Sequence, residues 1–126
     1  MKRLLALAIP LLIAASAPHV FTIGGEPFTQ ADILDARAQP DVTGHAAILI
    51  TLSPDGAKRL AMLTRAGIDK PMPIAIDGKL LAEPVVKGEI PDGIAQISGN
   101  FTLAEADALA LQISGKPPLV DSLEGP

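Results

Sequence analysis

The chain has 126 residues, a formal net charge of −4 at pH 7, and no Cys, Trp or Tyr. An acidic balance without a basic cluster argues against nucleic acid and anionic membrane surfaces as partners. The missing cysteines rule out a disulfide framework and thiolate metal sites, and the missing Trp and Tyr remove the usual stacking platforms for sugars and bases.

The N-terminal segment is typical of a secretory signal peptide. A positive start, Met1-Lys2-Arg3, precedes an apolar run, Leu4 to Ala15, and then an Ala15-Ser16-Ala17 cleavage pattern. A transmembrane helix needs about 20 apolar residues, so this run is short for a membrane span. We expect a signal peptide over residues 1–17 and a single periplasmic domain over residues 18–126; the alternative is that the segment stays uncleaved as an anchor.

Three elements are expected in the first half of the domain. Val20 to Ile23 predicts a short strand, and Thr29 followed by Asp32 predicts a brief capped helical turn. Ala46 to Leu52 is apolar on both faces, which predicts a central strand.

A helix should begin directly after this strand. Ser53 is a typical N-cap residue, Pro54 is tolerated at the first helical position, and Gly67 is a typical stop.

A hairpin is expected next. Asp77-Gly78 joins strands at Pro73–Ile76 and Lys79–Ala82, and this dipeptide suits the positive φ angles of a type I′ turn. Pro84 predicts an irregular continuation at a sheet edge.

The last motif is a joint between a strand and a helix. Ile94 to Ser98 predicts the strand, Gly99-Asn100 a tight bend after it, and Thr102 with Glu105 a capping box that opens a helix ending at Gly115. The expected buried stripe of this helix is Leu103, Ala106, Leu109, Ala110 and Ile113. Together the elements predict an α+β fold, in which two amphipathic helices pack on one face of a mostly antiparallel sheet.

Residues suited to catalysis or metal binding are sparse. His19 and His45 lack partners at metal-ligand spacing, and no serine-hydrolase or phosphate-binding motif occurs. Glu83 and Glu89 resemble a carboxylate pair, but solvated charges on an edge explain them better. The sequence therefore predicts neither an enzyme nor a cofactor; an enzyme of unrecognised type is the minority alternative.

Three stretches in the middle and end of the chain carry a family resemblance: LSPDGAKRLAMLT, PIAIDGKLLAEPVV and AQISGNFTLAEADALALQI. Their order and spacing resemble the head subdomain of the large periplasmic domain of SecD, an accessory protein of the Sec translocon. The specific pair is the hairpin with Asp77 and Gly78 and the joint Ser98-Gly99-Asn100-Phe101-Thr102, with Glu105 in the following turn. The resemblance covers roughly residues 28–113.

The resemblance implies a non-catalytic module that contacts translocating or unfolded polypeptide during protein export. It does not extend to proton-driven transport, which in SecD depends on membrane-embedded parts. Expected partners are a polypeptide or protein of the cell envelope, with components of the Sec translocon among the candidates. The candidate peptide-binding edge is formed by Pro84, Val85, Val86 and Glu89. The alternative function is an envelope adaptor that binds one specific folded partner and has no role in export.

Overall fold

The computed structural model describes residues 19–40 and 42–120, and the predicted signal peptide lies outside these residues. None of the helices in this described part is both long and apolar enough to cross a membrane. The elements in chain order are β1 (Phe21–Ile23), β2 (Glu26–Phe28), the 3₁₀ turn η1 (Gln30–Asp32), β3 (Ile33–Pro40), β4 (Ala46–Leu52), α1 (Pro54–Ala66), β5 (Ile74–Ile76), β6 (Lys79–Ala82), β7 (Ile94–Phe101) and α2 (Leu103–Ser114).

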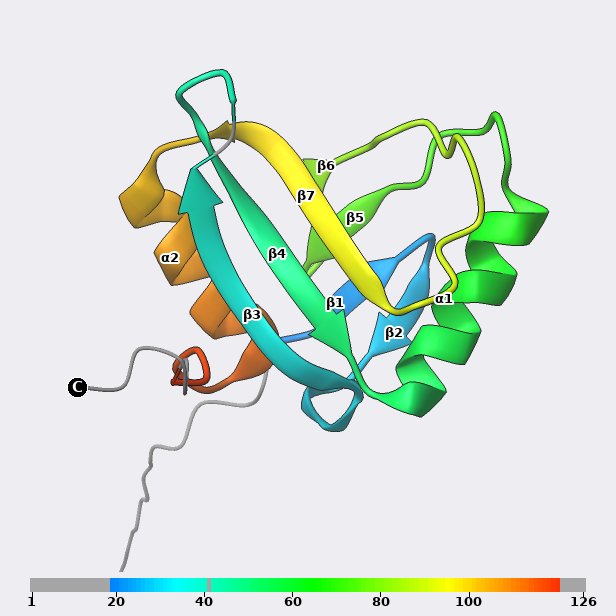
Figure 1. The fold of residues 1–126 in the computed structure, drawn as a ribbon, viewed down its shortest axis with the longest axis horizontal. Coiled ribbons are helices and arrows are strands. Elements are labelled where there is room, and N and C mark those ends of the chain that lie inside the picture. The colour runs from blue at the N-terminus through cyan, green and yellow to red at the C-terminus, as the bar shows by residue number, and fades with distance from the viewer. Residues whose placement is uncertain (1–18, 41, 121–126) are drawn as a thin grey trace, which may run out of the picture.

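The strands form two antiparallel sheets, which confirms the predicted α+β class. One sheet has the order β2-β1-β5-β6 and the other β3-β4-β7, whereas the sequence analysis placed the strands in a single layer. In Figure 1 the three-stranded sheet lies in front of the four-stranded sheet, with α2 beside β3 and α1 on the opposite side. One hydrophobic core, drawn from both sheets and both helices, joins the layers.

Strands β2 and β3 were not predicted. Pro40 is the last residue of β3 and pairs with Ala46 at the edge of the sheet, where proline is tolerated. Residues 35–39 of β3 alternate alanine with polar residues, so this part lacks the run of large apolar residues that marks β4.

The strand-to-helix joint differs from the prediction in one respect. β7 continues through Gly99 and Asn100 to Phe101, so these residues form a bulge in the strand and not a tight bend after it. The register jumps there, because Ser98 pairs with Ala47 and Phe101 with Ala46. A Cβ atom on Gly99 would lie 2.7 Å from the Phe101 ring, so a larger residue at this position would displace that ring.

The predicted capping box at the start of α2 is confirmed. The Thr102 hydroxyl accepts a hydrogen bond from the Glu105 amide at 3.1 Å, and the Glu105 carboxylate accepts one from the Thr102 amide at 2.9 Å. The buried stripe of α2 was partly wrong, since Leu103 is 55% exposed while Ser114 is buried. Helical side chains point toward the N-terminus, so a side chain in the first turn projects beyond the helix end.

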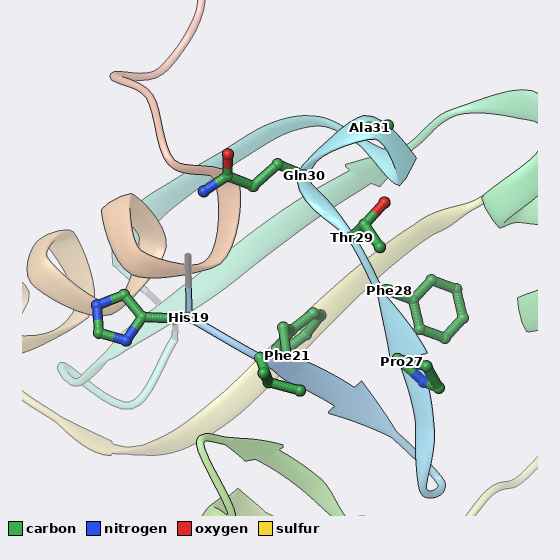
Figure 2. A pocket seen from close by; sticks show the side chains of 8 residues that line it. His19, Phe21, Pro27, Phe28, Thr29, Gln30 and Ala31 are labelled. Atoms are coloured by element: carbon green, nitrogen blue, oxygen red, sulfur yellow. The ribbon is translucent and has the colours of Figure 1, made fainter. Parts of the chain in front are cut away.

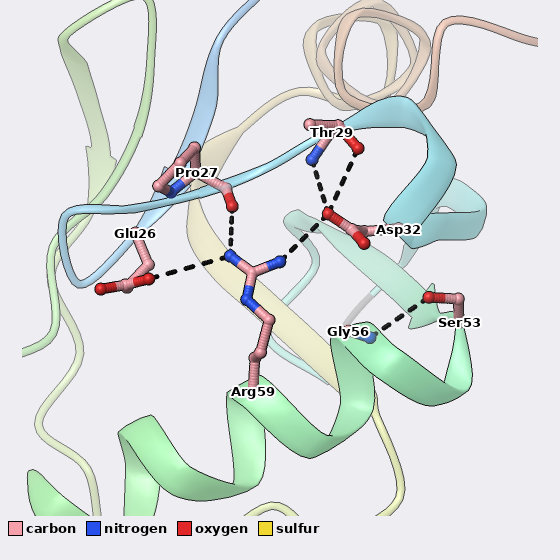
Figure 3. A network of polar contacts seen from close by, with 7 residues as sticks. All are labelled: Glu26, Pro27, Thr29, Asp32, Ser53, Gly56 and Arg59. Carbon is pink, nitrogen blue, oxygen red and sulfur yellow. Dashed lines mark hydrogen bonds and ion pairs between the residues drawn. The ribbon is translucent and has the colours of Figure 1, made fainter.

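Helix α1 is tied to η1 and β2 through Arg59 (Figure 3). Its guanidinium donates to the Asp32 carboxylate at 3.1 Å and to the Pro27 carbonyl, and it lies 4.2 Å from the centre of the Phe28 ring. The predicted N-cap is also confirmed, because the Ser53 hydroxyl accepts from the Gly56 amide at 3.2 Å.

Carboxylates hold both ends of the described chain. The Asp77 carboxylate accepts from the Val20 amide at 2.8 Å and contacts the His19 ring at 2.6 Å, and these bonds lower the pKa of Asp77. Asp77 also closes the predicted type I′ hairpin with φ 51°. At the other end, the Leu119 amide donates to the Asp35 carboxylate at 2.7 Å, and the Leu119 carbonyl accepts from Arg37 at 2.8 Å.

We predict that Thr102→Ala lowers the free energy of unfolding by about 1 kcal/mol, because the Glu105 amide loses its acceptor. Urea denaturation of the variant and the wild type measures this difference. Ser98→Ala, which removes an exposed hydroxyl outside the cap, is the control and should change stability by less than about 0.5 kcal/mol. Equal losses in both variants would contradict a specific role for the cap.

We also predict that Asp35 makes the fold sensitive to acid. Burial alone raises the pKa of Asp35, but the hydrogen bonds from Arg37 and Leu119 and the charge of Arg37 outweigh it and lower the pKa of this carboxyl. A lowered folded-state pKa gives a stabilisation that is complete above the ordinary carboxyl pKa of about 3.9 and is lost as the pH falls through the folded-state value.

Denaturation between pH 7 and pH 2 tests this prediction. Asp35→Asn should be less stable than the wild type at pH 7 and should lose less stability on acidification. Asp107→Asn, on the exposed part of α2, is the control. Equal acid sensitivity of Asp35→Asn and the wild type would contradict the prediction.

Candidate functional site

An apolar groove of about 530 Å³ lies between β7 and the segment that connects β6 to β7. In Figure 1 this segment runs around the molecule on the side of α1 before it enters β7. All four residues of the predicted binding edge line this groove: Pro84, Val85, Val86 and Glu89. Its floor consists of buried core side chains, namely Ile23, Ile50, Leu60, Thr64, Met72, Ile74 and Ile97.

The first wall of the groove, residues 84–90, has paired main-chain groups. The Pro84 carbonyl accepts from the Met72 amide at 2.8 Å. The Val86 amide donates to the Lys70 carbonyl at 3.0 Å, and the Val86 carbonyl accepts from the Asp69 amide at 2.8 Å. The wall therefore offers apolar side chains, such as the 46% exposed Val85, and Val86 at its centre has no free main-chain donor or acceptor.

Two contacts with α1 fix the end of this wall. The Thr64 hydroxyl, with Thr64 only 1% exposed, donates to the Leu60 carbonyl at 2.8 Å and accepts from the Ile90 amide at 3.0 Å. On the surface, Arg65 binds the Glu89 carboxylate at 3.0 Å and lowers the pKa of Glu89. The predicted edge residue Glu89 is thus a partner of Arg65 that orients the wall.

The second wall is β7, an edge strand that pairs only with β4 among the strands that the structure describes. Ala95, Gln96 and Ile97 contribute to the lining. Sequence reasoning did not place this strand at the site, because the approach of residues 84–90 to β7 depends on contacts with α1 that no local pattern encodes.

A second pocket of about 490 Å³ lies at the edge formed by β1 and β2 (Figure 2). Phe21 and Phe28 line it, and both belong to the buried core. The edge strand β2 is blocked there, since Pro27 has no N–H and its carbonyl accepts from Arg59. None of the predicted binding residues lies at this pocket.

The groove is lined mostly by apolar side chains. Within residues 19–40 and 42–120 no group of three or more His, Asp or Glu side chains is placed to hold a metal ion. The predicted motif residues have structural roles: Asp77 and Gly78 close the hairpin, and residues 98–105 form the bulge and the cap.

The comparisons with known proteins agree with the fold. A family model described as SecDF, P1 head subdomain, matches residues 18–117. The SecDF translocase subunit of Thermus thermophilus is 37% identical over 98 residues, which are 77% of this chain and 13% of that protein. The SecD subunit of Acidaminococcus fermentans is 35% identical over 97 residues, which are 76% of this chain and 23% of that protein.

A solved structure of SecDF, described as a membrane component that enhances protein export, superposes with a TM-score of 0.66 at 36% identity. The match covers 74% of this chain and 43% of the solved chain. The chain therefore spans only a small part of the curated relatives that it matches.

We predict that Thr64→Val loosens the groove wall, because the Ile90 amide loses its acceptor at a cost of about 1–3 kcal/mol. Thr64→Ser keeps the hydroxyl and is the matched control. Hydrogen exchange at Ile90 should be faster in Thr64→Val than in the wild type and unchanged in Thr64→Ser. Similar Ile90 exchange in the two variants would contradict the role of the hydroxyl.

Proposed function

The chain belongs to the SecDF P1 head subdomain family, and on this premise we propose that it binds extended or unfolded polypeptide in the periplasm during protein export. The role is that of a non-catalytic binding module. The match confirms the family resemblance drawn from the hairpin and the strand-to-helix joint. Candidate partners are exported chains and components of the Sec translocon.

The observation that carries this proposal is the open apolar groove beside β7. Its floor is formed by buried core side chains, and the apolar surface that folding leaves exposed there belongs to Pro84 and Val85 in the wall. A folded globular partner rarely fits a narrow groove, whereas an extended chain can place successive side chains into one. An unfolded polypeptide carries exposed apolar side chains that gain from this burial.

The size of the groove predicts weak and reversible binding. Burying one large apolar side chain contributes about 1.5–3 kcal/mol, and association costs at least about 4 kcal/mol in lost freedom of motion. The burial of a few such side chains therefore leaves only a small net free energy, so we expect the groove to bind an extended segment weakly. Weak binding suits a module that must release a chain in transit.

Photo-crosslinking in intact cells tests this function. We predict that a photo-reactive residue at position 85, in the wall of the groove, captures many exported chains or translocon subunits. The control position is Lys58, which is exposed on α1 and does not line the groove. Arg65 is unsuitable as a control because it binds Glu89 in the wall.

The pattern of adducts decides between the functions. Many adducts from position 85 and few from position 58 would support polypeptide binding. A single unrelated protein captured at position 85 would identify an envelope adaptor and contradict the proposal, as would the same adducts from both positions.

A further inference from the structure

Resting on the proposed function, we propose that the bound polypeptide adds a strand to the free edge of β7. In this arrangement the main chain of Gln96 forms the hydrogen bonds, and every second side chain of the bound segment enters the groove. Four observations support this arrangement: which main-chain groups of β7 point away from β4, where along β7 these groups become available, how other edge strands are blocked, and which charged residues line the groove.

The register of the sheet shows which groups of β7 face the open side. The Leu52 amide donates to the Gly93 carbonyl at 2.9 Å, so Gly93 directs its main chain toward β4. Main-chain direction alternates along an antiparallel strand, and Ala95 pairs with Ile50 in the same phase. Gln96 is one residue out of phase, so its N–H and C=O point away from β4 and toward the groove.

The N-terminal end of this open edge is defined by Asp92. Its carboxylate accepts a hydrogen bond from the Ile94 amide at 3.2 Å, which occupies the first outward N–H of the strand. At the apolar groove the available groups are then the Ile94 carbonyl and both main-chain groups of Gln96; Ser98 has the same main-chain direction but lies beyond the groove lining. These three groups lie beside the apolar lining and match the donors and acceptors of one short strand.

Two other edge strands, β2 and β3, are closed by the chain itself, and the remaining edge strand, β6, does not line the groove. At the outer edge of the four-stranded sheet, Pro27 has no N–H and Arg59 occupies its carbonyl. At the outer edge of the three-stranded sheet, Asp35 and Arg37 of β3 hold the main chain of Leu119 against the strand. Proteins normally protect edges in these ways, so an unprotected edge beside an apolar groove indicates a binding site for a strand.

The geometry also defines the sequence that fits. Residues opposite one another in a sheet place their side chains on the same face, so the residue opposite Gln96 points outward with the exposed Gln96 side chain. Its two neighbours point inward, on the side of Ala95 and Ile97, toward the apolar floor. The fitting segment therefore has apolar residues at alternate positions.

Charge complementarity narrows the occupant further. Glu89 in the wall is neutralised by Arg65, while Lys87 in the same wall has no ion-pair partner among the described residues. The groove therefore disfavours segments with lysine or arginine and favours an acidic residue at one end of the apolar stretch. An extended apolar segment with an acidic flank is the partner that these walls fit.

A scan of N-methylated peptides tests the proposal. The probe is the fluorescein-labelled peptide DSVTVSIGS, titrated with the purified full chain and followed by fluorescence anisotropy. Each derivative carries one N-methyl group, which removes one main-chain donor. We expect binding to weaken about threefold to tenfold at alternate positions and to change little at the positions between them.

The outcomes separate this inference from the proposed function. A scan without the two-residue period, at normal affinity for the unmodified peptide, overturns the added strand and leaves polypeptide binding in place. No binding of the unmodified peptide at millimolar concentration overturns both.

Variants of the protein give an independent test. Gln96→Pro removes the outward N–H and leaves the bonds to β4, because that N–H does not face β4. It should bind DSVTVSIGS about threefold to tenfold more weakly than Gln96→Ala, which loses the same side chain but keeps the N–H. Equal affinity of folded Gln96→Pro and Gln96→Ala overturns the proposal; if Gln96→Pro does not fold, the peptide scan decides.

Sedimentation equilibrium of the wild type tests a second copy of the chain as the occupant. A monomer supports the proposal. A dimer that Gln96→Pro dissociates overturns it, because two copies would then pair their β7 edges.

Discussion

The requirement that main-chain hydrogen-bonding groups be paired shapes this molecule more than any single side chain does. Dividing seven strands between two sheets creates more edges than one continuous sheet would have, and each edge exposes N–H and C=O groups. At β2, proline lacks the N–H and an arginine side chain binds its carbonyl, and at β3 the side chains of Asp35 and Arg37 hold the C-terminal segment beside the strand. The edge strand β7 pairs with no second strand among the described residues, and its outward side lies at the apolar groove.

The groove depends on α1 as much as on the strands around it. Leu60 and Thr64 lie in its floor, and the Thr64 hydroxyl holds Ile90 at the end of the wall. Gly93 lies at the start of β7 and has φ 73°, and a Cβ atom there would lie 2.6 Å from the Ala57 side chain. The buried face of α1 therefore contributes to the spacing between the two walls of the groove.

Short sequence motifs predicted the elements that are marked by capping residues, turn residues or a continuous apolar run. The capped helices, the hairpin at Asp77 and the central strand β4 all carry such signals within a few residues. The strand β3 carries no such local signal, and its pairing with β4 depends on tertiary contacts. The residues of the predicted binding edge do lie at one groove. The position of β7 beside that groove depends on the register of the strands, which the sequence alone does not predict.

The way the two chain ends are held has a mechanical consequence. Near the N-terminal end, Val20 is bound by Asp77 in a hairpin of the four-stranded sheet. Near the C-terminal end, Leu119 is bound by Asp35 and Arg37 in the three-stranded sheet. Tension applied between these ends is therefore carried from one sheet to the other across the shared core. The force would act on the packing between the two sheets, and side chains of this packing also form the floor of the groove. Stretching the domain would therefore also change the shape of the groove.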